Sequence, residues 1–135
     1  MKPEYRKAFV AATALALSLG FGAVASAQDA GIDEENKVVT IGAFTPVTGP
    51  VPFYAILTHA AESFYRHLNE NGGIDGWTVK YVTRDDGYDP ARSVAVTRQL
   101  VDDEGIFALS GAVGTATNVA VIPYAKEVGL PMVGP

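Results

Sequence analysis

The chain has 135 residues, a length that allows one domain at most. Of these residues 48% are hydrophobic, which is too apolar a composition for a disordered chain. A net charge of −5 without a basic stripe argues against binding to nucleic acid or to an anionic membrane surface. Because there is no cysteine, we expect neither a disulfide framework nor N-terminal lipidation.

The first 27 residues have the pattern of an export signal. Lys2, Arg6 and Lys7 give a basic start, residues 8–24 form an apolar run without charge, and a small-residue cleavage site ends at Ala27. The run is slightly long for a signal, so a membrane anchor is the alternative. We expect cleavage after Ala27 and release into a bacterial periplasm without a lipid anchor, because an Ala-Ser-Ala site closes the run.

The mature chain begins with residues 28–37, which are polar and acidic and predict a flexible leader. Residues 38–44 form a nearly continuous apolar run, which is typical of a strand buried on both faces. Three prolines and a glycine then exclude regular structure from residues 45–52.

Residues 53–71 change to the period of a helix. The predicted inward stripe comprises Leu57, Ala61, Phe64 and Leu68, widened by Ala60 and Tyr65. On the outer face, Glu62 and Arg66 are four residues apart, and we expect them to form an ion pair. Gly72-Gly73 supplies the left-handed residue that ends the helix.

Further strands and helices alternate along the rest of the chain. The expected strands are residues 77–84, 106–109 and 130–133. Asp89-Pro90 predicts the start of a helix over residues 90–103, because aspartate caps helices and proline fits their first position. A third helix, capped by Thr115 or Thr117, is expected to end before Gly129.

This alternation predicts an α/β fold, an open parallel sheet with flanking helices. The loops that follow the first three strands should then lie at the same edge, where such sheets bind small molecules. We therefore expect the ligand site where the three strand-and-loop segments of residues 39–50, 82–90 and 107–118 converge.

The glycine-rich loop over residues 111–117 is the strongest candidate for a ligand site. Gly114 lets a ligand approach the backbone, the following helix presents free N–H groups, and Thr115 and Thr117 add hydroxyls. The alternative is that both threonines only cap the helix. Tyr54, at the start of the first helix, is either a wall for an apolar ligand or a packing residue.

Neither the acidic residues nor the two histidines predict a metal site. Asp85, Asp86 and Asp89 do not fit a calcium-binding loop, so turn and cap chemistry is the preferred interpretation. His59 and His67 are about two helical turns apart, too far to share a zinc ion, and are expected to face solvent. No serine lies in a nucleophile elbow, so we expect neither catalysis nor a cofactor.

Three segments resemble a known family: IGAFTPVTGPVPFYA, NENGGIDGWTVKYVTRDDGYDPARSVAVTRQLV and GAVGTATNVAVIPYAKEVGLPMVGP. They are similar to the leucine/isoleucine/valine-binding proteins, the type I periplasmic receptors of branched-chain amino acid ABC transporters. The resemblance covers residues 38–135. It implies that these residues are the first part of the N-terminal lobe of a two-lobed receptor.

The resemblance also implies roles and partners. Thr115 corresponds to the hydroxyl that binds the ligand's α-carboxylate, Tyr54 lines the side-chain pocket, and Asp85 and Asp86 are structural. The expected ligand is a branched-chain or other small amino acid, or a related carboxylate or amide. The expected partners are the permease subunits, and the full-length receptor is expected to be a monomer. An exported α/β enzyme and an amide-sensing regulator on the same fold remain the alternatives.

Overall fold

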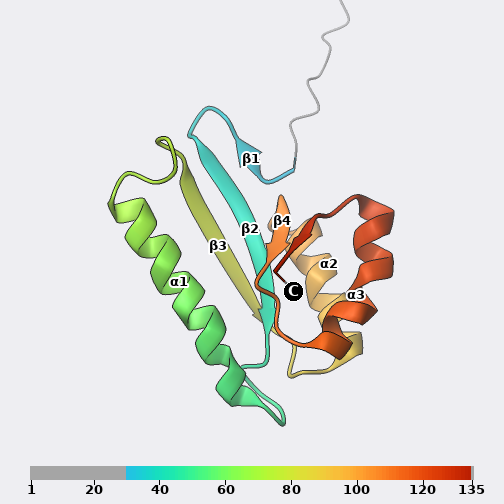
Figure 1. Ribbon diagram of the computed structural model, residues 1–135. Helices are drawn as coiled ribbons and strands as arrows, with labels where there is room; N and C mark the ends of the chain where they lie inside the picture. Colours follow the sequence, from blue (N-terminus) through green and yellow to red (C-terminus); the bar gives the residue numbers. More distant parts are fainter. Residues whose placement is uncertain (1–29, 135) are drawn as a thin grey trace, which may run out of the picture.

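The computed structural model describes residues 30–134, in which five strands form one sheet (Figure 1). Strand β2 (Val38–Thr45) pairs in parallel with β3 (Thr78–Asp85) on one side and with β4 (Ala108–Ser110) on the other. Strand β5 (Met132–Val133) continues the sheet in parallel beyond β4. The short β1 (Ile32–Asp33) pairs antiparallel with the start of β2. The predicted open parallel sheet is confirmed, apart from this antiparallel strand.

Helices flank the sheet on both faces. Residues 30–134 contain the 3-10 turn η1 (Pro52–Tyr54) and the helices α1 (Ala55–Glu70), α2 (Pro90–Asp102) and α3 (Thr115–Val128). Alternation along β3 separates the two faces: the Tyr81 ring contacts Tyr65 of α1, whereas the neighbouring Val82 packs against the core under α2 and α3. α1 therefore covers one face, and α2 and α3 together cover the other (Figure 1).

The main core lies between the sheet and the pair α2 and α3. Its largest fully buried members, Phe44, Leu100, Leu109 and Val121, are at most 1% exposed. Gly42 of β2 allows this close packing, because a Cβ atom there would lie only 3.0 Å from the Ile106 side chain. The strand ends that carry the loops are thus held by a well-packed layer.

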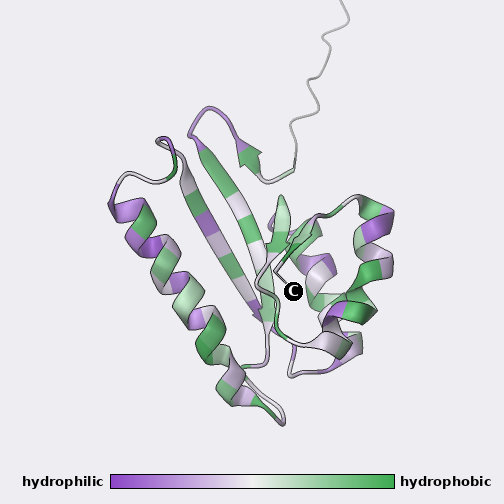
Figure 2. Ribbon diagram, viewed as in Figure 1, coloured by the Kyte–Doolittle hydropathy of each residue, from purple (hydrophilic) through white to green (hydrophobic). Residues whose placement is uncertain are grey.

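The predicted inward face of α1 was correct only in part: Ala61, Tyr65 and Leu68 are half-buried, but the other predicted members are exposed. Leu57 and Phe64, expected in the core, are 56% and 60% exposed, whereas Ala55 and Thr58 are buried. Hydrophobic bands therefore run along the outside of α1, and Figure 2 shows them between hydrophilic ones.

Polar contacts with β3 decide which face of α1 turns inward. Because β3 pairs with β2 alone among the described strands, the backbone of Val79 bonds instead to the Asn69 side chain, at 3.0 Å through its N–H and 2.9 Å through its carbonyl. Glu62 accepts a hydrogen bond from the Thr83 hydroxyl at 3.1 Å. The ion pair expected between Glu62 and Arg66 is therefore replaced by a contact with the sheet.

The segment predicted as a flexible leader is in part structured. The strand β1 lies within it, and the carbonyl of Gly31 accepts a hydrogen bond from the Thr40 N–H at 2.7 Å. The Asn36 backbone and side chain both donate to the Asp33 carboxylate and close the turn before β2. The predicted signal, residues 1–27, lies outside the described residues. In residues 30–134, no helix has the length and apolar character needed to cross a membrane.

Candidate functional site

The loops after β2, β3 and β4 meet at one edge of the sheet, as the sequence predicts. The Val113 N–H donates to the carbonyl of Phe44 at 3.2 Å, and the Asp86 N–H donates to the carbonyl of Thr45 at 3.2 Å. Each loop is thus bonded to the end of β2, its central neighbour. A ligand at this edge can contact all three loops together.

A cavity of about 410 Å³ lies at this edge, between α1 and α3. Its apolar wall comprises Tyr54, Leu57, Tyr88, Val113, Val119 and Ile122. Gly114, Thr115 and Asn118 line it at the start of α3. The structure therefore brings together three of the four residues predicted to bind a ligand: Tyr54, Gly114 and Thr115.

The N-terminus of α3 opens at the cavity. Gly114 precedes the helix with φ of 113°, and no side chain caps the first turn. Thr115 is exposed at the first helical position. The cap interpretation of the two threonines was thus wrong, and free N–H groups with the positive end of the helix dipole face a concave site. Such an arrangement favours an anion.

Thr117 does not line the cavity, which corrects the prediction that it binds the ligand. Its side chain is fully buried, and its hydroxyl donates to the carbonyls of Val113 at 2.9 Å and Gly114 at 2.8 Å. The residue instead fixes the loop before α3. It also requires glycine at position 114, since a Cβ atom there would lie 2.5 Å from the Thr117 hydroxyl oxygen.

Asn118 is a cavity residue that sequence reasoning missed. Its side-chain nitrogen donates to the carbonyls of Ala112 at 3.0 Å and Gly114 at 2.7 Å. Asn118 therefore ties the first turn of α3 to the loop that precedes this helix. Its buried oxygen has no hydrogen-bond partner in the described protein. The spacing was the available signal, because a residue three positions after Thr115 lies on the same helix face.

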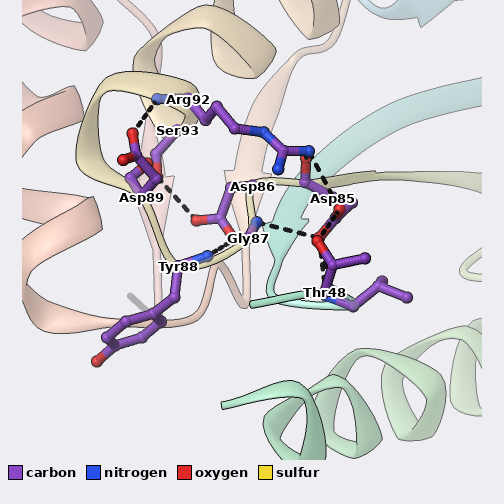
Figure 3. Close-up of polar contacts among 9 residues, drawn as sticks. Thr48, Asp85, Asp86, Gly87, Tyr88, Asp89, Arg92 and Ser93 are labelled. Carbon is purple, nitrogen blue, oxygen red and sulfur yellow. Dashed lines mark hydrogen bonds and ion pairs between the residues drawn. The ribbon is translucent and has the colours of Figure 1, made fainter. Parts of the chain in front are cut away.

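Asp85 ties the loop after β2 to the loop after β3 (Figure 3). It accepts hydrogen bonds from the Thr48 hydroxyl at 2.7 Å and from the N–H groups of Val47, Thr48 and Gly87 at 2.9 to 3.1 Å, and it pairs with Arg92 at 3.1 Å. Desolvation acts to raise the pKa of Asp85, but the hydrogen bonds from Thr48, Gly87 and Val47 outweigh it and hold the pKa well below its ordinary range.

Asp86 and Asp89, the other two aspartates of this segment, also serve turns and caps, as predicted. Asp89 precedes α2 and accepts a hydrogen bond from the Arg92 N–H at 2.8 Å, which is the expected N-cap. Asp86 is fully buried and is bonded to the loop itself. No group of three or more metal-ligating side chains suited to an ion occurs within residues 30–134. His59 and His67 are exposed, as expected.

Comparison with known proteins agrees with this arrangement. The family described as periplasmic binding protein matches residues 38–135. The Leu/Ile/Val-binding protein homolog 3 of Brucella melitensis is 32% identical over 127 residues, which are 93% of this chain and 32% of the relative. The leucine-, isoleucine-, valine-, threonine- and alanine-binding protein of Pseudomonas aeruginosa is 32% identical and covers 88% of this chain and 32% of the relative.

Solved structures share the fold. The branched-chain amino acid transporter substrate-binding protein LivJ of Streptococcus pneumoniae, in complex with isoleucine, aligns with a TM-score of 0.66 at 25% identity, over 71% of this chain and 28% of that one. A substrate-binding periplasmic protein from Ralstonia solanacearum aligns with a TM-score of 0.64 at 32% identity, over 71% of this chain and 28% of that one.

The fold and the strand-end site define the N-terminal lobe of a type I periplasmic binding protein. The chain belongs to the periplasmic binding protein family, of the leucine/isoleucine/valine-binding type. It spans about a third of the length of the curated relatives that it matches.

Proposed function

We propose that this chain contributes to an extracytoplasmic receptor of an ABC transporter, which binds a branched-chain or other small amino acid, or a related carboxylate or amide. One observation carries the proposal. The cavity has the N-terminus of α3 and Thr115 at one side and an apolar wall with Tyr54 at the other. An anionic group and an apolar side chain can therefore be bound together, which is what a neutral-side-chain amino acid requires.

The family supports the wider setting of this receptor. Relatives and structural neighbours carry names of amino acid-binding and transporter substrate-binding proteins. By that analogy, the protein acts in the periplasm, delivers its ligand to permease subunits and is not an enzyme. Export through residues 1–27 with cleavage after Ala27, and a monomeric state of the full-length receptor, belong to the same proposal.

The test is a binding panel on the whole protein as its host exports it. Intact-mass analysis of the periplasmic fraction should show Gln28 at the N-terminus. Calorimetry then compares leucine, isoleucine and valine with the amines that lack their carboxylates. We expect the acids to bind at least tenfold more tightly, because the amines cannot bond to the helix N-terminus.

Two results would contradict the proposal. Equal affinity for the acids and the amines would show that the N-terminus of α3 does not bind a carboxylate. If NMR of the ligand solution shows that the protein converts a bound compound into another one, the alternative of an exported α/β enzyme is favoured instead.

A further inference from the structure

Tyr88 lies in the cavity beside the start of α3, although the sequence did not single it out. Its ring lies against Gly114: a Cβ atom added to Gly114 would lie 2.6 Å from the ring carbon Cε2 and 3.3 Å from Cζ. Gly114 directly precedes Thr115. The ring therefore lies at the end of the cavity where the proposed carboxylate binds.

The backbone of Tyr88 is in the left-handed region, with φ of 61°, which is unfavourable for a bulky residue. The buried Asp86 carboxylate holds this conformation. One oxygen accepts from the Tyr88 N–H at 3.0 Å, and the other accepts from the Ser93 hydroxyl of α2 at 2.7 Å. Figure 3 shows the Tyr88 ring extending away from this cluster.

A tyrosine with a fixed backbone is a rigid wall, since its ring can move only about two side-chain torsions. The ring also lies against Gly114, so it has no room to move toward this residue. Any ligand group close to the carboxylate must fit the space that the ring leaves. An additional methyl group at this point of the ligand would overpack the space between the ring and the start of α3.

We infer that Tyr88 is a specificity-determining residue of the proposed site, and that its ring excludes ligands with an extra substituent on the carbon next to the carboxylate. This inference rests on the proposed function, because it takes the carboxylate to lie at the N-terminus of α3. Tyr54, at the start of α1, acts on the other part of the ligand, the apolar side chain.

The experiment compares leucine with α-methyl-leucine by calorimetry on the whole exported protein. The main variant is Tyr88→Asn, because asparagine removes the ring and tolerates the left-handed backbone. We expect the ratio of the two dissociation constants, α-methyl-leucine over leucine, to fall about tenfold relative to the wild type. Tyr88→Phe keeps the ring and should keep the wild-type ratio.

The outcomes separate this inference from the proposed function. A wild-type protein that binds neither acid contradicts both. A wild-type protein that binds leucine, with the same ratio in Tyr88→Asn, overturns the role of Tyr88 alone. Should Tyr88→Asn fail to fold, the ratio in Tyr88→Gly decides in the same way, since glycine adopts this backbone conformation freely.

Discussion

Thr115 and Thr117 are two residues apart, yet the structure gives them opposite roles. Thr115 is exposed at the cavity, whereas Thr117 is fully buried and its hydroxyl donates to the backbone carbonyls of the preceding loop. Thr115 is the first residue of α3 and lines the cavity, whereas the Thr117 side chain turns back onto the loop that precedes the helix. Of the two threonines, only Thr115 lines the cavity and can donate its hydroxyl to a ligand.

Replacing Thr115 by alanine should weaken binding of leucine by roughly ten- to hundredfold. A hydrogen bond to a charged group is worth about 1.5–3 kcal/mol, and each 1.4 kcal/mol is about tenfold in affinity. Thr115→Ser retains the hydroxyl and should bind nearly as the wild type. Calorimetry with leucine and with its decarboxylated amine measures both effects.

The control for this prediction is Tyr54→Ala, which removes an apolar wall and no hydrogen-bond donor to the carboxylate. It should reduce the affinity for leucine more than that for alanine, because a larger side chain loses more contact. An equal loss of affinity for acid and amine in Thr115→Ala would show that Thr115 does not bind the carboxylate.

At the scale of elements, Asp85 joins the loop after β2 to the loop after β3. These loops approach each other closely, since a Cβ atom on Gly49 would lie 2.2 Å from the Gly87 carbonyl oxygen. The loop after β2 leads directly into η1 and Tyr54. Asp85 therefore positions one side of the cavity without lining it.

The depressed pKa of Asp85 predicts a loss of stability in acid. The folded pKa lies below the ordinary value of 3.8, so the unfolded chain binds the proton more readily. The contribution of Asp85 is fully present above that value and is lost as the pH falls below it toward the folded pKa. Urea unfolding of residues 28–135 between pH 2 and 7 should show this decline.

Asp85→Asn should lower the free energy of unfolding at neutral pH by roughly 1–3 kcal/mol and flatten its decline below pH 4. Asp103→Asn is the matched control, because Asp103 is an exposed aspartate after the end of α2. It should leave the acid limb nearly unchanged. An equally steep acid limb in Asp85→Asn and the wild type would assign the pH dependence to other groups.

Across the whole molecule, the outside of η1 and α1 carries large apolar side chains that are mostly exposed. Phe53, Ile56, Leu57 and Phe64 are each more than 55% exposed. Contiguous apolar surface of this kind promotes association. The open side of β3 adds an edge that pairs with no other described strand.

Residues 28–135 produced alone should therefore self-associate as their concentration rises. The double variant Ile56→Lys and Phe64→Lys should reduce the association, because it places two charges on the outer face of α1. His67→Lys, an exposed change at the other end of the same helix, is the control. Sedimentation velocity over a range of concentrations measures the effect, and a single monomer species at every concentration would refute the prediction.

The features that local signals encode could be predicted from the sequence. The apolar run of β2, the Asp89-Pro90 start of α2 and the Gly129 end of α3 were confirmed, because propensity and capping depend on neighbouring residues. The order of these elements places the loops at one edge of the sheet. That placement was enough to bring Tyr54, Gly114 and Thr115 to one cavity.

The features that depend on distant partners became visible only in the folded chain. The inward face of α1 follows from the bonds of Asn69 to Val79, which an apolar stripe cannot reveal. The role of Thr117 depends on the carbonyls of the preceding loop, and Tyr88 enters the site because Asp86 and Gly114 hold it there. The periodicity of a helix shows which of its faces are apolar. Which face packs against the sheet depends also on the polar groups of the neighbouring strand that need hydrogen-bond partners.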